Sequence, residues 1–308
     1  MDAEAEPPMW VLRDDPQRGR GLWATRDIAA GTPVLLAHAF SSGVGDASCA
    51  ACLVDLAAVG GGADGPRCAG CGMRYCSLTC ASDDTHTARA CAMLRRLRSS
   101  ADWDTPIVRH LVRLVCALGD PAAPAPARGS GADLIALAQR LRATPDRTQL
   151  APADVFALDA CRVRMPTDRY KSVAATSKFV LRLWRKARAD VEPRAAPVAA
   201  AEPADVAGAL CRIMHNGFAV RNARGDEVGC ALLPTASMFN HSCEPSCKLR
   251  ATLGGARAGR SLEFETARAL TAGDELTISY VDVSLPRETR RERLDHSYYF
   301  ACACARCA

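Results

Sequence analysis

The residues with the clearest chemistry are cysteines, which fall into two groups. Seven of the sixteen lie between positions 49 and 91, and three more lie within the last seven residues. Two residues between paired cysteines form a tight turn that directs both thiolates at one ion. Together with one histidine, the first group supplies eight ligands and predicts two closed, four-coordinate zinc sites: Cys49, Cys52, Cys68, Cys71, Cys76, Cys80, His86 and Cys91.

Metal explains these cysteines better than disulfides do. The N-terminus is acidic where a secretory signal would be basic and then apolar, and no run of about 18 uncharged apolar residues occurs. We therefore expect a soluble protein of the nucleus, the cytoplasm or both, with no membrane segment and with reduced thiols. The alternative is a small core of free thiols, but about 45 residues with few large apolar side chains need metal to fold.

The overall charge says little about partners. The net charge is +5, and arginine far outnumbers lysine, so contact with acidic partners is possible. The chain lacks the concentrated basic face of a dedicated nucleic-acid binder. We do not expect nucleic acid as the primary ligand.

A second set of chemically informative residues lies outside the cysteine groups. Asn240-His241-Ser242-Cys243 is followed, thirty-five residues after Asn240, by Glu275-Leu276-Thr277-Ile278-Ser279-Tyr280. Near the N-terminus, Arg18-Gly19-Arg20-Gly21 contains two glycines that let the backbone approach a ligand closely.

Short strands and a helical middle must position these residues. Apolar residues recur at helical spacing over 107–118, 134–141 and 180–184, whereas the Ala/Pro-rich stretches 121–128 and 191–205 predict surface connections. Turn-bounded apolar runs predict strands at 22–25, 34–36, 229–233, 248–252, 262–266 and 276–280.

Five motifs in this order resemble those of SET-domain protein methyltransferases. They are Arg18 to Ile28, Asn216-Gly217-Phe218, Asn240 to Ser246, Gly273 to Tyr280, and the Tyr298 to Cys307 segment, which resembles a post-SET tail. Glycine stands at 217 where the family commonly has serine, so a hydroxyl contact is absent there.

The cysteine cluster, with Tyr75-Cys76-Ser77 at its centre, resembles a MYND zinc finger. The resemblance assigns interleaved ligands: Cys49, Cys52, Cys76 and Cys80 to one ion, and Cys68, Cys71, His86 and Cys91 to the other. His86 precedes Cys91 by five residues where about four is usual, and the 54–67 loop is long and glycine-rich.

A SET core split by a MYND finger resembles the SMYD class of lysine methyltransferases. Well-known animal members continue into a C-terminal helical-repeat domain, whereas this chain ends one residue after Cys307. We therefore expect a short form whose substrate groove lacks that wall. A third zinc is implied at Cys243, Cys302, Cys304 and Cys307, since the tail alone supplies three of the four ligands of a closed site.

The resemblance also implies roles for individual residues. Arg18, Gly19, Arg20, Asn216, Asn240, His241, Tyr280 and Phe300 would bind S-adenosyl-L-methionine. Phe218, Ser237 and Tyr298 would contact the substrate lysine, and Tyr280 would be the catalytic residue.

The expected fold class is α+β, a β-rich SET fold of short sheets split by the finger and a helical insert. The expected domains are residues 1–46 (first part of SET), 47–92 (finger), 93–210 (helical insert), 211–285 (catalytic part of SET) and 286–308 (post-SET zinc tail).

The resulting functional hypothesis is a methyltransferase, expected as a monomer, that uses S-adenosyl-L-methionine and three zinc ions to modify an exposed lysine of a histone or other protein. The alternative is a catalytically silent SET scaffold whose finger recruits partners, such as proline-containing peptides, in transcriptional regulation. Asn240, His241 and Tyr280 favour activity, because a silent scaffold has no chemical need for that tyrosine.

Overall fold

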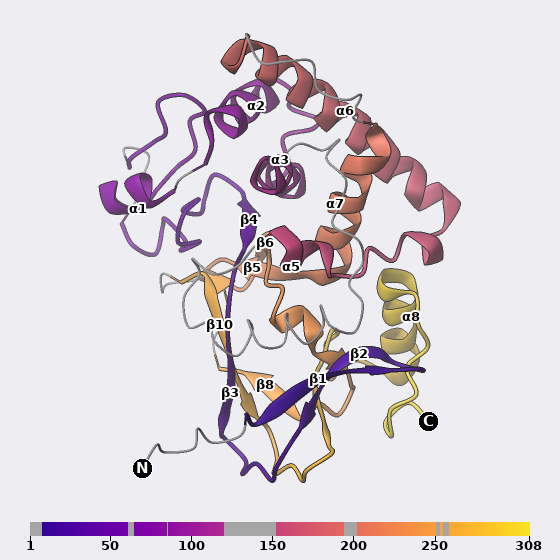
Figure 1. Cartoon of the computed structure of the whole chain (residues 1–308). Helices are drawn as coiled ribbons and strands as arrows, with labels where there is room; N and C mark the ends of the chain where they lie inside the picture. The colour runs from indigo at the N-terminus through magenta and orange to yellow at the C-terminus, as the bar shows by residue number, and fades with distance from the viewer. Residues whose placement is uncertain are drawn as a thin grey trace, which may run out of the picture.

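The computed structural model describes residues 8–60, 65–84, 86–119, 152–193, 202–250, 253–254 and 259–308. The expected helix at 134–141 and the expected connection at 121–128 lie outside these ranges. Among the described helices, none combines the length and apolar character needed to cross a membrane. Most helices gather around α3 in the upper half of Figure 1, whereas α8 lies beside the small sheets of the lower half.

The first sheet brings the separate motifs together. Its strand order is β1-β2-β11-β7, with bounds Trp10–Asp15, Gly19–Ala24, Glu275–Ile278 and Asn240–His241. Strands β1 and β2 form an antiparallel hairpin, and β11 pairs antiparallel with β2. On its other side β11 runs parallel to β7, with Ile278 opposite His241. The first, third and fourth motifs are therefore neighbours in one sheet.

Two further sheets lie in the described part of the chain. The second has the order β3-β10-β8, with bounds Pro33–His38, Ser261–Thr266 and Cys247–Leu249. The third has the order β4-β6-β5-β9, with bounds Ser41–Val44, Glu227–Leu232, Gly217–Arg221 and Leu253–Gly254. All six expected strands are present with boundaries shifted by a few residues, and β1, β4, β5, β7 and β9 are additional.

The helices have the following bounds: α1 Leu78–Asp83, α2 Ala88–Arg98, α3 Pro106–Leu118, α5 Pro152–Phe156, α6 Thr167–Val191, α7 Pro203–Asn216 and α8 Arg287–Tyr298. Short 3-10 turns occupy Arg162–Arg164 and Ala236–Met238. Ser77, Thr87 and Thr105 cap α1, α2 and α3 by accepting backbone N–H groups through their hydroxyls.

Helix α7 corrects one expectation. The 191–205 stretch was expected to be a connection throughout, but α7 begins at Pro203. Proline fits the first helical position because its missing N–H would have no partner there. Glu202 and Asp205 then form a reciprocal capping box. The helix continues to Asn216, past the expected boundary at 210, and delivers His215 and Asn216 to the functional site described below.

Helix α3 packs unusually close to β4. A side chain at Gly43 would lie 2.3 Å from the carbonyl oxygen of Pro106, so only glycine fits. Next to this contact, the fully buried His110 bonds Ser41 Oγ through Nε2 at 2.7 Å and Cys230 Sγ through Nδ1 at 3.1 Å. This polar network ties α3 to β4 and β6 inside the core.

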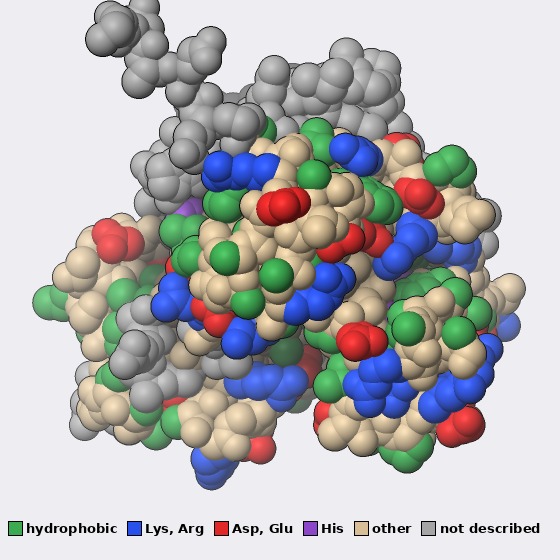
Figure 2. Space-filling model, turned by 90° about the horizontal axis from the view of Figure 1, so that it is seen from below, with side chains coloured by type: hydrophobic (Ala, Val, Ile, Leu, Met, Phe, Trp, Pro, Cys, Tyr) green, Lys and Arg blue, Asp and Glu red, His purple; other side chains and the backbone are tan. Residues whose placement is uncertain are grey.

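On the face seen in Figure 2, basic and acidic side chains are interspersed over the described part of the chain and do not gather into one basic area.

Candidate active site and metal centres

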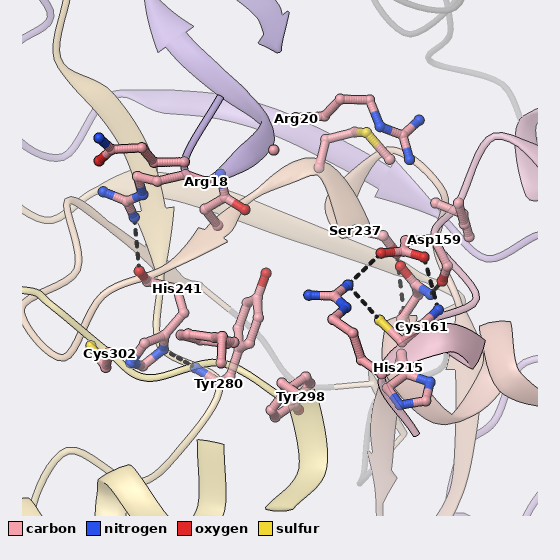
Figure 3. Close-up of a pocket in the computed structure, with 18 of the residues that line it drawn as sticks. Arg18, Arg20, Asp159, Cys161, His215, Ser237, His241, Tyr280, Tyr298 and Cys302 are labelled. Atoms are coloured by element: carbon pink, nitrogen blue, oxygen red, sulfur yellow. Dashed lines mark hydrogen bonds and ion pairs between the residues drawn. The ribbon is translucent and has the colours of Figure 1, made fainter. Parts of the chain in front are cut away.

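A cavity of about 820 Å³ lies where the β1–β2 hairpin, residues 157–164, the end of α7 and the tail meet. Figure 3 shows Arg18, His241 and Tyr280 on one side of it, with Asp159 and Cys161 on the other. Ten of the eleven residues expected to bind cofactor or substrate line this cavity: Arg18, Gly19, Arg20, Asn216, Ser237, Asn240, His241, Tyr280, Tyr298 and Phe300.

Phe218 is the expected site residue that is not among those lining the cavity. It lies on β5, and its half-buried ring meets the ring of Phe264 edge-on, with 6.3 Å between centroids. The third sheet therefore directs Phe218 towards core packing.

A polar bridge joins the first motif to the third. Arg18 lies in the β1–β2 turn, and Gly19, which begins β2, has a φ of +71°. The Arg18 guanidinium forms an ion pair with Glu275 Oε2 at 2.7 Å and donates to the carbonyl of His241 at 3.1 Å. Asn240 Nδ2 donates to the other oxygen of Glu275 at 2.8 Å. Glu275, to which the sequence analysis gave no role, thus sets the position of both Arg18 and Asn240.

The electrostatics of Glu275 follow from its burial. Its side chain is only 7% exposed. Burial raises its pKa, while the Asn240 amide and the Arg18 guanidinium oppose that rise.

His241 links the cavity to a cysteine. Its Nδ1 accepts the backbone N–H of Tyr280 at 3.0 Å, so the ring proton belongs on Nε2, which lies 3.3 Å from Cys243 Sγ. Burial, helped by the positive charges of Arg18 and Arg290, lowers the pKa of His241 to about 4. The imidazole is therefore neutral near pH 7, as this pair of contacts requires.

Tyr280 and Tyr298 form an aromatic wall. Their ring centroids are 4.8 Å apart, and the Tyr280 hydroxyl donates to the carbonyl of Phe239 at 2.5 Å. Burial raises the pKa of Tyr280 well above its ordinary value, and Tyr298 and Glu275 raise it further. Tyr280 is therefore a neutral phenol that donates a hydrogen bond.

On the opposite side of the cavity Asn216 was predicted, whereas Asp159 and Cys161 of the helical insert were not. Asp159 accepts the backbone N–H of Cys161 at 2.8 Å and pairs with Arg164 at 2.5 Å. Asn216 donates to the carbonyl of Asp159 at 2.8 Å. His215 also lines this side. In the sequence, His215 could have been noticed because it is adjacent to Asn216. Asp159 is a single aspartate after a short apolar run, and nothing in the sequence marks it as a site residue.

Three groups of ligand atoms are suited to metal. They are Cys49, Cys52, Cys76 and Cys80; Cys68, Cys71, His86 and Cys91; and Cys243, Cys302, Cys304 and Cys307. Within each group all ligand atoms lie within 4.8 Å of one another. These groups have the same members as the sets implied by the resemblance, and none of the sixteen cysteines forms a disulfide.

The sulfur separations fit a tetrahedral ion. Four thiolates at the zinc–sulfur distance of about 2.3 Å would lie about 3.8 Å apart. The observed separations are 3.6 Å for Cys52 and Cys76, 3.7 Å for Cys68 and Cys91, and 3.5 Å for Cys243 and Cys307.

His86 has the surroundings of a metal ligand. Its Nε2 lies 3.6 Å from Cys68 Sγ, and its Nδ1 lies 3.3 Å from a carboxylate oxygen of Asp84. Asp84 is buried, accepts the Tyr75 hydroxyl at 2.9 Å and binds Arg113 of α3 through both oxygens. Such a carboxylate fixes the orientation of a metal-binding imidazole. The five-residue spacing to Cys91 therefore does not remove His86 from the cluster.

Comparison with known proteins identifies the family. The SET domain model matches residues 19–281, which is most of the chain. The chain belongs to the SET-domain family. The expected α+β class, with short sheets split by a cysteine-rich segment and helices, is confirmed.

Curated relatives of this SET-domain chain match over a shorter region. The "Histone-lysine N-methyltransferase SMYD3" of Mus musculus is 38% identical over 103 residues, which are 33% of this chain and 23% of the relative. A SET and MYND domain-containing protein of Dictyostelium discoideum is 36% identical over 92 residues, 30% of this chain and 22% of the relative. The matches thus span about a quarter of these relatives' length.

Among solved structures, the SET domain of LSMT bound to lysine and AdoHcy is similar at 12% identity with a TM-score of 0.41, covering 97% of this chain and 54% of that chain.

Proposed function

We propose that this SET-domain chain is an S-adenosyl-L-methionine-dependent protein-lysine N-methyltransferase acting on a lysine of a histone or another protein. One observation carries the proposal: a single cavity collects Asn240, His241, Tyr280 and the tail aromatics Tyr298 and Phe300. Relatives bearing the names histone-lysine and N-lysine methyltransferase support the same reaction.

The cofactor would occupy the side of the cavity formed by Arg18, Gly19, Arg20, Asn240, His241 and Phe300, and Asn216 would contact it from the opposite side. The residues present fit it: the two guanidiniums suit a carboxylate, and glycine at 19 keeps that approach free of a side chain. When bound, the cofactor supplies a methyl group on a positively charged sulfur. Arg18 and Glu275 would hold the Asn240 loop in place for it.

The lysine side of the cavity must favour an uncharged amine. At pH 7, deprotonating a lysine of ordinary pKa, near 10.4, costs about 4 to 5 kcal/mol. An apolar channel lowers that cost because it disfavours the ammonium form. Tyr280 and Tyr298 would form the walls, with Ser237 at the rim. The contribution of Phe218 would be indirect, through its packing against Phe264.

Tyr280 would act as the catalytic residue by orientation. Its neutral hydroxyl already donates to the carbonyl of Phe239. The amine of the substrate lysine would therefore lie next to both this hydroxyl and this carbonyl. Alignment of reacting groups can lower a barrier by about 7 to 11 kcal/mol. No protein nucleophile is needed.

The three ligand groups would each hold a zinc ion of structural type. The same scheme divides the chain into the SET parts 1–46 and 211–285, the finger 47–92, the insert 93–210 and the tail 286–308. Through Cys243, the tail ion would fix Tyr298 and Phe300 against the cavity.

The test is methyl transfer from radiolabelled S-adenosyl-L-methionine to histones and to a lysate by the purified, zinc-loaded chain. Tyr280→Phe should lower transfer about 10²-fold while cofactor binding persists, because misalignment alone can cost that much. Tyr170→Phe, on α6 and away from the cavity lining, is the matched control.

The adaptor alternative makes the opposite prediction. Cofactor binding without label transfer from any tested protein would favour a silent scaffold. In either case the finger is proposed to bind proline-containing peptides, a role supported by Leu78 of α1, which is 79% exposed. We also propose a monomer acting in the nucleus or cytoplasm, with protein as its main partner.

A further inference from the structure

A buried arginine lies against the tail cysteines. Arg290 of α8 is only 4% exposed, yet arginine is almost never fully buried without a partner. Its Nε donates to Cys243 Sγ at 3.2 Å, and its Nη2 lies 3.7 Å from Cys307 Sγ. The remaining donors reach the carbonyls of Leu285 at 2.6 Å and Arg306 at 3.3 Å.

The partners of Arg290 differ from those of two other arginines with little exposed surface. Arg109 pairs with Asp104 and Asp46, and Arg113 pairs with Asp84. Within the described ranges, no carboxylate forms an ion pair with Arg290. Its charge instead faces the sulfurs of Cys243 and Cys307. An uncompensated buried cation is costly, so the sulfur cluster must supply the negative charge.

A four-thiolate zinc site has that charge, because four thiolates around a divalent ion leave a net charge of −2. We propose that Arg290 is the positioning residue and counter-cation of the tail metal site, holding Cys243 and Cys307 in place for the ion. The inference rests on the proposed zinc ligation by the tail. It assigns to α8 a role that none of the motifs predicted.

Two neighbouring residues also contact Cys243. His241 approaches the same sulfur through Nε2 at 3.3 Å. Arg306, in the tail itself, donates to the carbonyl of Cys243 at 2.9 Å. Arg290 of α8 and His241 of the cavity thus contact the sulfur of Cys243, and Arg306 of the tail binds its carbonyl. Loss of Arg290 should therefore loosen both the ion and the tail that closes the cavity.

The experiment measures zinc release from the full zinc-loaded chain with a chromogenic chelator. In Arg290→Met, one equivalent should bind about 10- to 100-fold more weakly, the usual cost of losing a partner of a metal ligand, while two equivalents keep wild-type affinity. Cys307→Ala identifies the tail phase, because that phase should be missing. Arg293→Met, an exposed position on the same helix, should release zinc like the wild type.

The two finger ions also report folding within the same molecule, so their retention in Arg290→Met separates a local effect from general unfolding. Arg290→Lys keeps the charge without the forked donors and should release the tail ion at an intermediate rate. By loosening the tail, Arg290→Met alone should weaken S-adenosylhomocysteine binding. In the Cys307→Ala background, where the tail site is already lost, adding Arg290→Met should weaken that binding no further. Three unchanged zinc affinities in Arg290→Met would overturn the inference. A wild type with two zinc ions would overturn either the tail site or the His86 site, and an unchanged content of two in Cys307→Ala would show that the tail site is the one that fails.

Discussion

Gly21→Ala tests whether the Arg18–Glu275–Asn240 bridge organises the cofactor side of the cavity. A methyl group at Gly21 would lie 2.8 Å from Asn240 Nδ2 and 2.8 Å from Glu275 Oε1. These two atoms are also hydrogen-bonded to each other at 2.8 Å. The methyl group must therefore push apart the two partners of one bond. Breaking a hydrogen bond to a charged group costs about 1.5 to 3 kcal/mol.

If that cost falls on the loop conformation that binds cofactor, affinity should weaken about 10- to 150-fold. Titration calorimetry with S-adenosylhomocysteine measures this, and urea unfolding measures the accompanying stability loss. Gly45→Ala is the matched control, because its nearest contact is an ordinary 3.7 Å. Wild-type affinity and stability in Gly21→Ala would refute the proposed bridge.

Three further outcomes are expected. Asp84→Ala should destabilise the chain by about 3 to 5 kcal/mol in urea unfolding, because Arg113, whose side chain is only 9% exposed, loses its counter-ion, whereas exposed Asp83→Ala should not. Burial lowers the pKa of His110 to about 3, so the unfolded chain takes up the proton first as pH falls, and about 2 kcal/mol of stability should be lost between pH 7.5 and 5. His110→Gln should flatten this dependence of stability on pH, and an unchanged dependence would contradict the assignment of the effect to His110. Chelator treatment should open the finger to protease cleavage between residues 49 and 91, and readdition of zinc should restore protection.

The metal groups could be predicted from the sequence because their geometry is local. Two residues between cysteines nearly fix the distance between two thiolates, so ligand identity follows from spacing. Even His86, with its unusual spacing, joins Cys68, Cys71 and Cys91. The cavity residues were predictable for a different reason: they belong to motifs that one sheet, with β7 parallel to β11, brings together.

The remaining features depend on contacts between distant segments. Asp159 reaches the cavity because α7 presents Asn216 to its carbonyl, a contact across 57 residues that periodicity does not reveal. Glu275 stands in a recognised motif, yet its role depends on Arg18, which lies in the distant β1–β2 turn. Phe218 was expected in the lysine channel, but the pairing of β5 directs it to Phe264. Strand register decides such cases, because neighbouring residues face opposite sides of a sheet.

The imidazole of His241 connects the proposed catalytic tyrosine, Tyr280, to a proposed ligand of the tail metal site, Cys243. His241 accepts the Tyr280 amide on Nδ1 and meets Cys243 through Nε2, so it needs one bare nitrogen and one N–H. A doubly protonated ring would lose the acceptor that holds Tyr280. Burial beside Arg18 and Arg290 lowers the pKa of His241 to about 4 and thereby prevents that loss near pH 7. Arg290, which faces the tail cysteines, and Arg18, which supports Asn240, thus help to keep this histidine neutral. The contacts with Tyr280 and Cys243 then select which of its two nitrogens carries the proton.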